Sequence, residues 1–276
     1  DFVEDSAGTG FVHIAPGHGT DDYNLGRSVG LPIYSPVDDD GAFAHTDELP
    51  IEEQMPVEMI GKRILAKNGV SEANQAVIDQ LRSTEDLCLL QEYTHKYPNC
   101  WRSKTPVIFR AMDQWFVKID HEIGDQTFRQ LALKEIDNVT WVPDWGINRI
   151  KGAVESRPDW CISRQRSWGV PIPVFYDADG EPIVDAQVVR NTADLFEKEG
   201  SNAWFEKSVE DLWSTVKPSE WSGKDAAKKS TDTLDVWIDS GSSSRAVLKA
   251  RKELHHEAEG NEEWQADVYL EGSDQH

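Results

Sequence analysis

Cysteines and long apolar runs are scarce in this sequence. Three cysteines occur among 276 residues, and Cys88, Cys100 and Cys161 show no CxxC or CxxxH spacing. We therefore expect no zinc site and no disulfide framework, and we expect the protein to work in a reducing compartment. No run approaches the roughly 20 apolar residues of a membrane-spanning helix, and the opening residues 1–5 show no signal-peptide pattern. The sequence predicts a cytoplasmic protein without a membrane partner.

Basic residues are also few. The chain has 28 Lys and Arg against 50 Asp and Glu, which gives a formal net charge of −22 and a pI near 4.7. A surface built mainly to neutralise phosphates would be positive. Any contact with nucleic acid must therefore use local basic patches or segments outside this chain. The fractions of charged residues (28%) and of hydrophobic residues (38%) are typical of a globular protein.

Hydrophobic periodicity and capping residues predict a mixture of helices and strands. Helices are expected over 72–83 (capped by Ser71), 124–136, 144–154 (introduced by Pro143) and 186–199. Strands are expected over 9–15 (closed by Pro16 and Gly17), 87–98, 105–119, 160–163 and 174–176. Residues 31–61 are rich in Pro, Gly and Asp and are expected to form loops and short strands.

Two further apolar runs, 234–238 and 268–270, each end in a small polar turn. Parallel strands that end in this way carry the ligand site of open α/β sheets. The residues alone thus predict an α/β fold with a nucleotide-sized site, but no reaction. Because the first residue is not Met and the second run lies just before the last residue, we expect a fragment of a longer protein.

Four regions carry motifs that resemble one family. They are 8–23 (GTGFVHIAPGHGTDDY), 100–106 (CWRSKTP), 158–171 (PDWCISRQRSWGVP), and 233–242 (TLDVWIDSGS) together with 269–276 (YLEGSDQH). In order and spacing, the whole chain resembles the middle of a class I isoleucyl-tRNA synthetase. The first motif is shared with the valine and leucine enzymes, whereas the motifs at 158–171, 233–242 and 269–276 are of the isoleucine type.

The resemblance implies a fold and two domains. The α/β chain would be part of a class I Rossmann-type catalytic domain with the C-terminal part of an inserted, β-rich editing domain. Residues 1–95 would belong to the editing domain and residues 96–276 to the catalytic domain, with a polar insertion at about 177–230.

The resemblance also implies an activity for the longer protein, which would be monomeric. It would activate isoleucine with ATP, taken with Mg²⁺ as substrate, and transfer it to the isoleucine tRNA. It would also hydrolyse wrongly charged valyl-tRNA. Neither of the family's ATP signatures, of the His-Ile-Gly-His and Lys-Met-Ser-Lys-Ser types, occurs in this chain. We therefore expect the chain alone to be inactive, and we expect no metal site within it.

Two residues match the family's editing site. Asp22 would hold the α-ammonium of the misattached amino acid, because a carboxylate suits a compact cation with three donors. His13 would help to exclude the isoleucine side chain. From the residues alone, a core strand histidine is the favoured interpretation of His13, and Asp22 could be a carboxylate that favours a helix start, a role that Asp21 fits better. His18, between two glycines, is expected to shape the loop.

Other residues match the adenylate site. Glu271 would bind the substrate ammonium, Gly272 would let the adenylate approach the backbone, and Trp237 would pack against the isoleucine side chain. The neighbouring positions in the same pocket are Asp274 and Gln275. With 11 tryptophans in the chain, Trp237 alone would read as ordinary core.

Arg164 and Arg166 form a short basic stretch beside Trp168 that could contact phosphates of tRNA or ATP; solvated or salt-bridged arginines are the alternative. Two other functions stay open at this point: a valine- or leucine-type synthetase, and a synthetase-derived binding module without catalysis.

Overall fold

The chain divides into two compact units, Asp1–Asp113 and Gln114–His276. The computed structural model describes residues 3, 8–46, 49–65, 71–92, 94–258, 261–263, 266 and 268–270. Helices and short strands are mixed, as the expected α/β class requires. The domain boundary that the resemblance implies, between residues 95 and 96, concerns a family insertion and stays a prediction. None of the helices described here is long and apolar enough to cross a bilayer.

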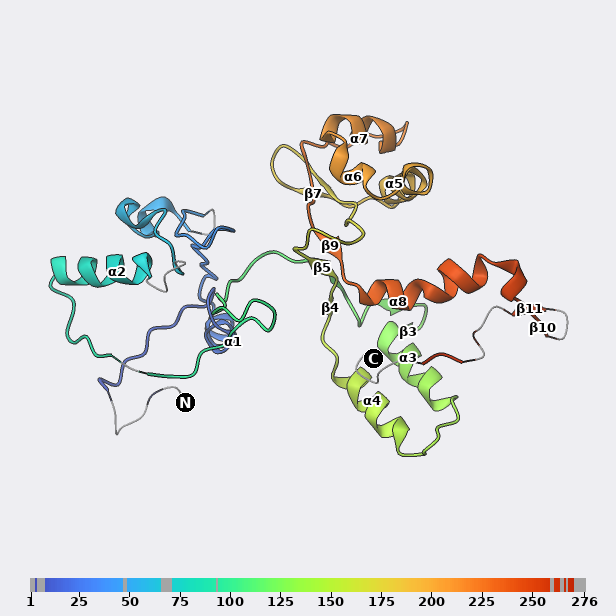
Figure 1. Cartoon of the computed structure of the whole chain (residues 1–276), viewed down its shortest axis with the longest axis horizontal. Coiled ribbons are helices and arrows are strands. Elements are labelled where there is room, and N and C mark those ends of the chain that lie inside the picture. The colour runs from blue at the N-terminus through green and yellow to red at the C-terminus, as the bar shows by residue number, and fades with distance from the viewer. Residues whose placement is uncertain are drawn as a thin grey trace. The chain divides into compact units, whose positions relative to one another are not determined.

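The described part of the first unit consists mainly of helices, turns and loops. Its described part contains α1 (Thr20–Val29), η1 (Ile51–Glu53), η2 (Val57–Met59) and α2 (Glu72–Ser83) (Figure 1). The Ser71 hydroxyl accepts a hydrogen bond from the backbone N–H of Asn74 at 3.0 Å, which satisfies a donor that the helix leaves free. The helix predicted over 72–83 is confirmed, and so is the loop character of 31–61, which holds isolated bridges and 3₁₀ turns.

The strand predicted over 9–15 is wrong. These residues form no ladder in the described chain, and Phe11 is 89% exposed. Strand propensity reflects packing against cross-strand neighbours, and an apolar run does not supply the neighbour. The turn at Pro16 and Gly17 is confirmed, since the backbone N–H of His18 donates to the carbonyl of Ala15 at 2.9 Å. The strands predicted over 87–98 and 105–119 are also wrong for most of their length, because few of these residues pair with a neighbouring strand in the described chain.

Short strands and helices alternate in the second unit. The strands are β1 (Phe116–Val117), β2 (Glu122–Ile123), β3 (Gln126–Thr127), β4 (Trp160–Cys161), β5 (Ser163–Arg164), β6 (Phe175–Tyr176), β7 (Pro182–Ile183), β8 (Lys228–Lys229), β9 (Thr233–Leu234), β10 (His256–Ala258) and β11 (Asn261–Glu263). The helices are α3 (Phe128–Asp137), α4 (Gly146–Ser156), α5 (Ala186–Glu199), α6 (Ala203–Glu206), α7 (Val209–Val216), α8 (Trp237–Ser243), the π-helical η3 (Ser244–Lys249) and η4 (Lys252–Leu254). The strands predicted at 160–163 and 174–176 are confirmed.

All ladders in the described residues are antiparallel. Strand β1 pairs with β4, β2 with β3, β5 with β9, β10 with β11, and β6 lies between β7 and β8. The parallel strands expected at 234–238 and 268–270 are therefore wrong: β9 returns along β5 in the opposite direction, the chain then turns into α8, and 268–270 forms no strand.

Helices α3 and α4 lie side by side (Figure 1). α3 begins at Phe128 rather than at 124, because the hairpin β2–β3 occupies the residues before it. Thr127 and Gln130 form a capping box, each side chain accepting from the other's backbone N–H, at 3.2 and 2.8 Å. The helix predicted over 144–154 is confirmed to within two residues.

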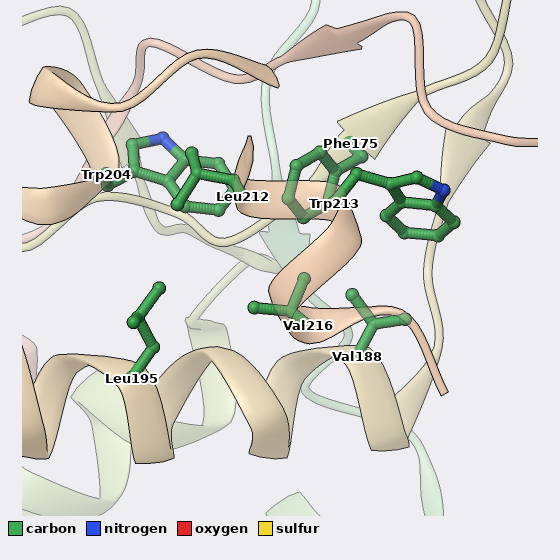
Figure 2. Close-up of a cluster of buried hydrophobic side chains, with 7 residues drawn as sticks. All are labelled: Phe175, Val188, Leu195, Trp204, Leu212, Trp213 and Val216. Atoms are coloured by element: carbon green, nitrogen blue, oxygen red, sulfur yellow. The ribbon is translucent and has the colours of Figure 1, made fainter. Parts of the chain in front are cut away.

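A hydrophobic core of the second unit is built by β6 and by the helices α5, α6 and α7, which lie between β6 and β8 in the sequence. Figure 2 shows Val188 and Leu195 pointing from α5 toward Val216, Leu212 and the aromatic side chains. The aromatic members, all buried, are Phe175, Trp204 and Trp213, with ring centroids 4.9 and 5.2 Å from Phe175 to the two indoles. The helix predicted over 186–199 is confirmed as α5, and the carboxylate of the preceding Asp185 accepts hydrogen bonds from the backbone N–H groups of Gln187 and Val188.

Candidate functional site

A largely apolar cavity of about 940 Å³ lies in the second unit. Its walls come from α3, α4, β4, α8 and η3. The apolar lining includes Phe128, Ala132, Val154, Trp160, Trp237 and Val247. Ligand sites are typically concave, apolar and of this size. A side chain of branched aliphatic shape would find apolar contact here, and the small Ser240 and Gly241 in the lining leave room beside it.

Two tryptophans face this cavity from different elements. Trp237, the first residue of α8, is 38% exposed and lines the cavity, so it is not ordinary core. Trp160, in β4, lines the same cavity and was not singled out in the sequence. The motif at 158–171 contains Trp160, but spacing alone does not reveal that β4 and α8 share a cavity.

Asp235 connects these two tryptophans. It is 5% exposed, and its Oδ2 accepts the indole N–H of Trp160 at 2.9 Å. Its Oδ1 accepts from the guanidinium of Arg164 and from the backbone N–H of Trp237, the latter at 3.3 Å. A buried carboxylate without partners would cost several kcal/mol, so these bonds hold it in place. Asp235, too, was missed in the sequence, where nothing marks a buried carboxylate.

Arg129 lines the cavity, but its donors are engaged by the protein. Its Nε and Nη2 donate to the two carboxylate oxygens of Asp120 at 2.8 and 2.9 Å, and its Nη1 donates to the carbonyl of Val154 at 2.5 Å. The hydrogen bond between the pair lowers the pKa of Asp120 and raises that of Arg129. The arginine therefore fixes α3 against α4.

The two arginines of the basic stretch, Arg164 and Arg166, lie in different surroundings. Arg164 is ion-paired with the buried Asp235. Arg166 is exposed, with one bond of 3.3 Å from its Nη1 to the carbonyl of Gln165, and Trp168 beside it is 89% exposed. Arg166 thus keeps donors available for a phosphate, whereas the charge of Arg164 is already balanced.

The remaining predicted residues of this site lie outside the described residues: Glu271, Gly272, Asp274 and Gln275. The described chain reaches the cavity wall at Tyr269, two residues before Glu271. Elsewhere in the part of the chain that is described, no group of three or more His, Cys, Asp or Glu side chains could hold a metal ion.

A second candidate site lies at the start of α1 in the first unit. Asp21 and Asp22 both occupy the first turn, but Asp21 is exposed and Asp22 is half-buried. The Asp22 carboxylate lies against Gly19: a Cβ at Gly19 would sit 2.5 Å from Oδ2. Within the described residues, no hydrogen bond or ion pair engages this carboxylate, and none links it to His13, which is exposed. Its oxygens are therefore available to a cationic group.

The loop before α1 is held by the segment around residue 110. The His18 ring nitrogen Nδ1 lies 2.8 Å from the carbonyl of Phe109, and the Ala111 N–H donates to the carbonyl of Gly17 at 2.7 Å. A Cβ at Gly17 would collide with the carbonyl of Tyr34, so only glycine permits this approach. His18 shapes the loop, as expected, and so fixes where the Asp22 turn begins.

A polar cavity of about 570 Å³ adjoins this turn at Tyr23. Its lining includes Asp38, His45, Arg110 and Asp113. Arg110 donates from Nη1 to Asp39 at 2.9 Å, while its buried Nε has no hydrogen-bond partner in the described structure. No local pattern in the sequence indicates this cavity, because its lining comes from segments far apart in the chain.

Known proteins resemble this chain over its whole length. The family model for class I tRNA synthetases (I, L, M and V) matches residues 21–276. The chain is 49% identical to an isoleucine–tRNA ligase from Methylacidiphilum infernorum (isolate V4) and 45% identical to one from Thermotoga maritima; each match covers 100% of this chain and 27% of the relative. A third, from Microcystis aeruginosa, is 47% identical, with 100% and 26% covered. The chain spans about a quarter of the length of these curated relatives, and it belongs to the class I tRNA synthetases of the isoleucine, leucine, methionine and valine group.

Proposed function

We propose that this chain is a segment of an isoleucine–tRNA ligase, and that the second unit helps to activate isoleucine with ATP. The observation that carries the proposal is the apolar cavity with Trp160 and Trp237 in its walls. The relatives that match the whole chain at 45–49% identity bear that name, which supports isoleucine over the valine or leucine alternatives. The α/β fold would then be part of a Rossmann-type catalytic domain that carries an inserted editing domain.

In this proposal the cavity receives the aliphatic side chain. The flat indole rings exclude water and restrict the shape that fits. The substrate's ammonium would be held by Glu271, Gly272 would let the adenylate come close to the backbone, and Asp274 and Gln275 would line the same pocket. Arg166, with its exposed guanidinium, would contact phosphates of ATP or of the isoleucine tRNA. The longer protein would act in the cytoplasm as a monomer.

An apolar pocket cannot by itself reject valine. One methylene changes binding by only about 1–3 kcal/mol, a range for which this very enzyme is the standard example. We therefore propose that the first unit contributes to a second, hydrolytic site for valyl-tRNA. The half-buried Asp22 carboxylate, with no described partner, would accept the α-ammonium, and His13 would limit the size of the side chain that enters.

The experiment is isoleucine-dependent ATP–pyrophosphate exchange in a full-length synthetase that carries this segment, with the isolated 276-residue chain beside it. We expect exchange in the full-length protein that prefers isoleucine to valine and leucine, and none in the isolated chain. Trp237→Ala should raise KM for isoleucine more than KM for ATP. A full-length protein that prefers valine or leucine, or that shows no exchange, would overturn the proposal.

A further inference from the structure

We infer that Asp235 is a positioning residue that sets the shape of the amino-acid pocket by holding Trp160 and Trp237 together; the inference rests on the proposed activation of isoleucine. Asp235 does not line the cavity itself. It acts from behind the wall through its hydrogen bonds to the two tryptophans. Its role would be to decide how far apart the two indole rings stand, and hence which aliphatic side chain fits.

Trp160 and Trp237 lie at one end of the β5–β9 ladder, each three residues away in sequence from the Ser163–Leu234 pair. Trp160 lies in β4, which pairs with β1, and Trp237 opens α8, which follows β9. Asp235 adds a link beyond the end of this ladder: its backbone N–H donates to the carbonyl of Ile162 at 2.8 Å, and its carboxylate accepts the indole N–H of Trp160 and the backbone N–H of Trp237. Displacing this carboxylate would leave the ladder in place but release the Trp160 indole from the start of α8, and so change how the two walls face each other.

The indole N–H bond fixes the Trp160 ring about its side-chain torsions. A tryptophan has one polar hydrogen, and here that hydrogen is directed at Asp235 Oδ2 at 2.9 Å. The residue also lines the cavity. Without the bond, the ring can turn to another rotamer, because side-chain wells are separated by small energies. The cavity would then lose a wall of defined orientation.

Only a carboxylate satisfies this site. The Asp235 side chain meets donors on both oxygens: the indole N–H on Oδ2, and the Arg164 guanidinium and the Trp237 N–H on Oδ1. An asparagine has one acceptor oxygen and a donor NH₂ group. In either orientation of its amide, the NH₂ would face a donor. Asp235→Asn must therefore release either Trp160 or the pair formed by Arg164 and the Trp237 backbone, although it hardly changes volume.

The test compares selectivity in ATP–pyrophosphate exchange by a full-length synthetase carrying this segment. In Asp235→Asn we expect the ratio of kcat/KM for isoleucine over valine to fall about tenfold, within the range that one methylene can produce. The loss should lie mainly in KM for isoleucine, with a smaller change in kcat. A general loss of folded enzyme would lower the apparent kcat/KM for isoleucine and for valine by the same factor and leave their ratio unchanged.

Asp177→Asn is the matched control. Asp177 and Asp235 are each 5% exposed and each ion-paired, Asp177 with Lys224. Asp177 lies outside the cavity lining, so its substitution should lower thermal stability without altering the isoleucine-to-valine ratio. A second variant, Trp160→3-benzothienylalanine, keeps the ring shape but replaces the N–H by sulfur. It should shift the ratio in the same direction as Asp235→Asn, and the two changes combined should be less than additive.

The outcomes separate the two hypotheses. A wild-type protein without isoleucine-dependent exchange would overturn the proposed function. Normal wild-type exchange together with an unchanged isoleucine-to-valine ratio in Asp235→Asn would overturn the positioning role alone. If Asp235→Asn does not fold, the benzothienyl variant decides: an altered ratio supports the role of the Asp235–Trp160 bond, and an unaltered ratio overturns it.

Discussion

Asp22→Ala is expected to block deacylation of valyl-tRNA in a full-length synthetase carrying this segment, while isoleucine activation stays near normal. The Asp22 carboxylate is half-buried and has no partner within the described residues, so an ammonium bound there would lose this anionic contact. A hydrogen bond to a charged group contributes about 1.5–3 kcal/mol, which corresponds to a loss of roughly 10- to 150-fold in binding. Misalignment of the ester toward water would add to this loss.

Asp21→Ala is the neighbouring control. Both carboxylates lie in the first turn of α1, so either substitution removes a favourable interaction with the helix dipole of about 0.3–1 kcal/mol. Because Asp21 is exposed, Asp21→Ala should therefore lower stability as much as Asp22→Ala does, but it should not slow hydrolysis of valyl-tRNA. A comparison of the two variants separates the ammonium contact from helix stabilisation.

Gly19→Ala perturbs the same carboxylate without removing it. The backbone of Gly19 is extended, with φ −165° and ψ 145°, a conformation that alanine adopts without strain. Its new Cβ would lie 2.5 Å from Asp22 Oδ2, so the carboxylate must move while the helix remains. We expect deacylation between that of wild type and that of Asp22→Ala, with little change in melting temperature.

The assay is hydrolysis of pre-formed valyl-tRNA for isoleucine, measured beside thermal melting of each variant. If Asp21→Ala is inactive and Asp22→Ala hydrolyses normally, the wrong carboxylate has been assigned. If all three variants slow equally and melt earlier by equal amounts, the turn is only a folding element, and the editing role proposed for Asp22 is refuted.

Two pH-dependent predictions concern other parts of the chain. Side-chain and backbone hydrogen bonds from Ser103 are the largest causes that lower the pKa of Cys100 to about 7, so alkylation of Cys100 by iodoacetamide should reach half its maximal rate near that pH, and Ser103→Ala should move the midpoint upward; an unmoved midpoint would contradict this. Burial raises the pKa of Asp177, but the N–H of Glu181 and the ammonium of Lys224 help to lower it overall. A carboxylate whose pKa is lower in the folded state stabilises above its unfolded pKa, about 3.9, and loses this contribution as pH falls. The melting difference between wild type and Asp177→Asn should therefore shrink below about pH 4, and a constant difference from neutral to acid pH would rule out the assignment.

Local signals predicted helices well and strands poorly. The helix over 72–83 was predictable because Ser71 caps it, and the helix over 186–199 because Asp185 precedes it. The segment 9–15 failed because a strand requires a neighbour that the apolar run does not contain. Likewise, 234–238 is a strand only in its first residue, since hydrophobic runs of this length do not distinguish a strand from the start of a helix.

The site was predictable only in part. Trp237 was identified through the family motif, and it lies in the cavity wall. Trp160 and Asp235 were missed because their roles depend on contacts across about 75 positions of sequence, between β4 and the start of α8. No spacing rule marks an aspartate as buried beneath two tryptophans. The assignments of Asp22 and His13 stay predictions, because neither makes a described contact that would identify its role.

The aromatic core formed by β6 and the helices α5, α6 and α7 affects how the sequence of the second unit can vary. The chain enters the segment that holds α5, α6 and α7 after Tyr176 and leaves it before Lys228. These two residues are register partners in one antiparallel ladder. Entry and exit are thus neighbours, and Phe175, Trp204 and Trp213 pack against one another rather than around the cavity. Segments with adjacent ends and their own core are the places where chains accept insertions and replacements. Evolution or an engineer could lengthen, shorten or exchange the residues between these strands while the cavity walls keep their positions.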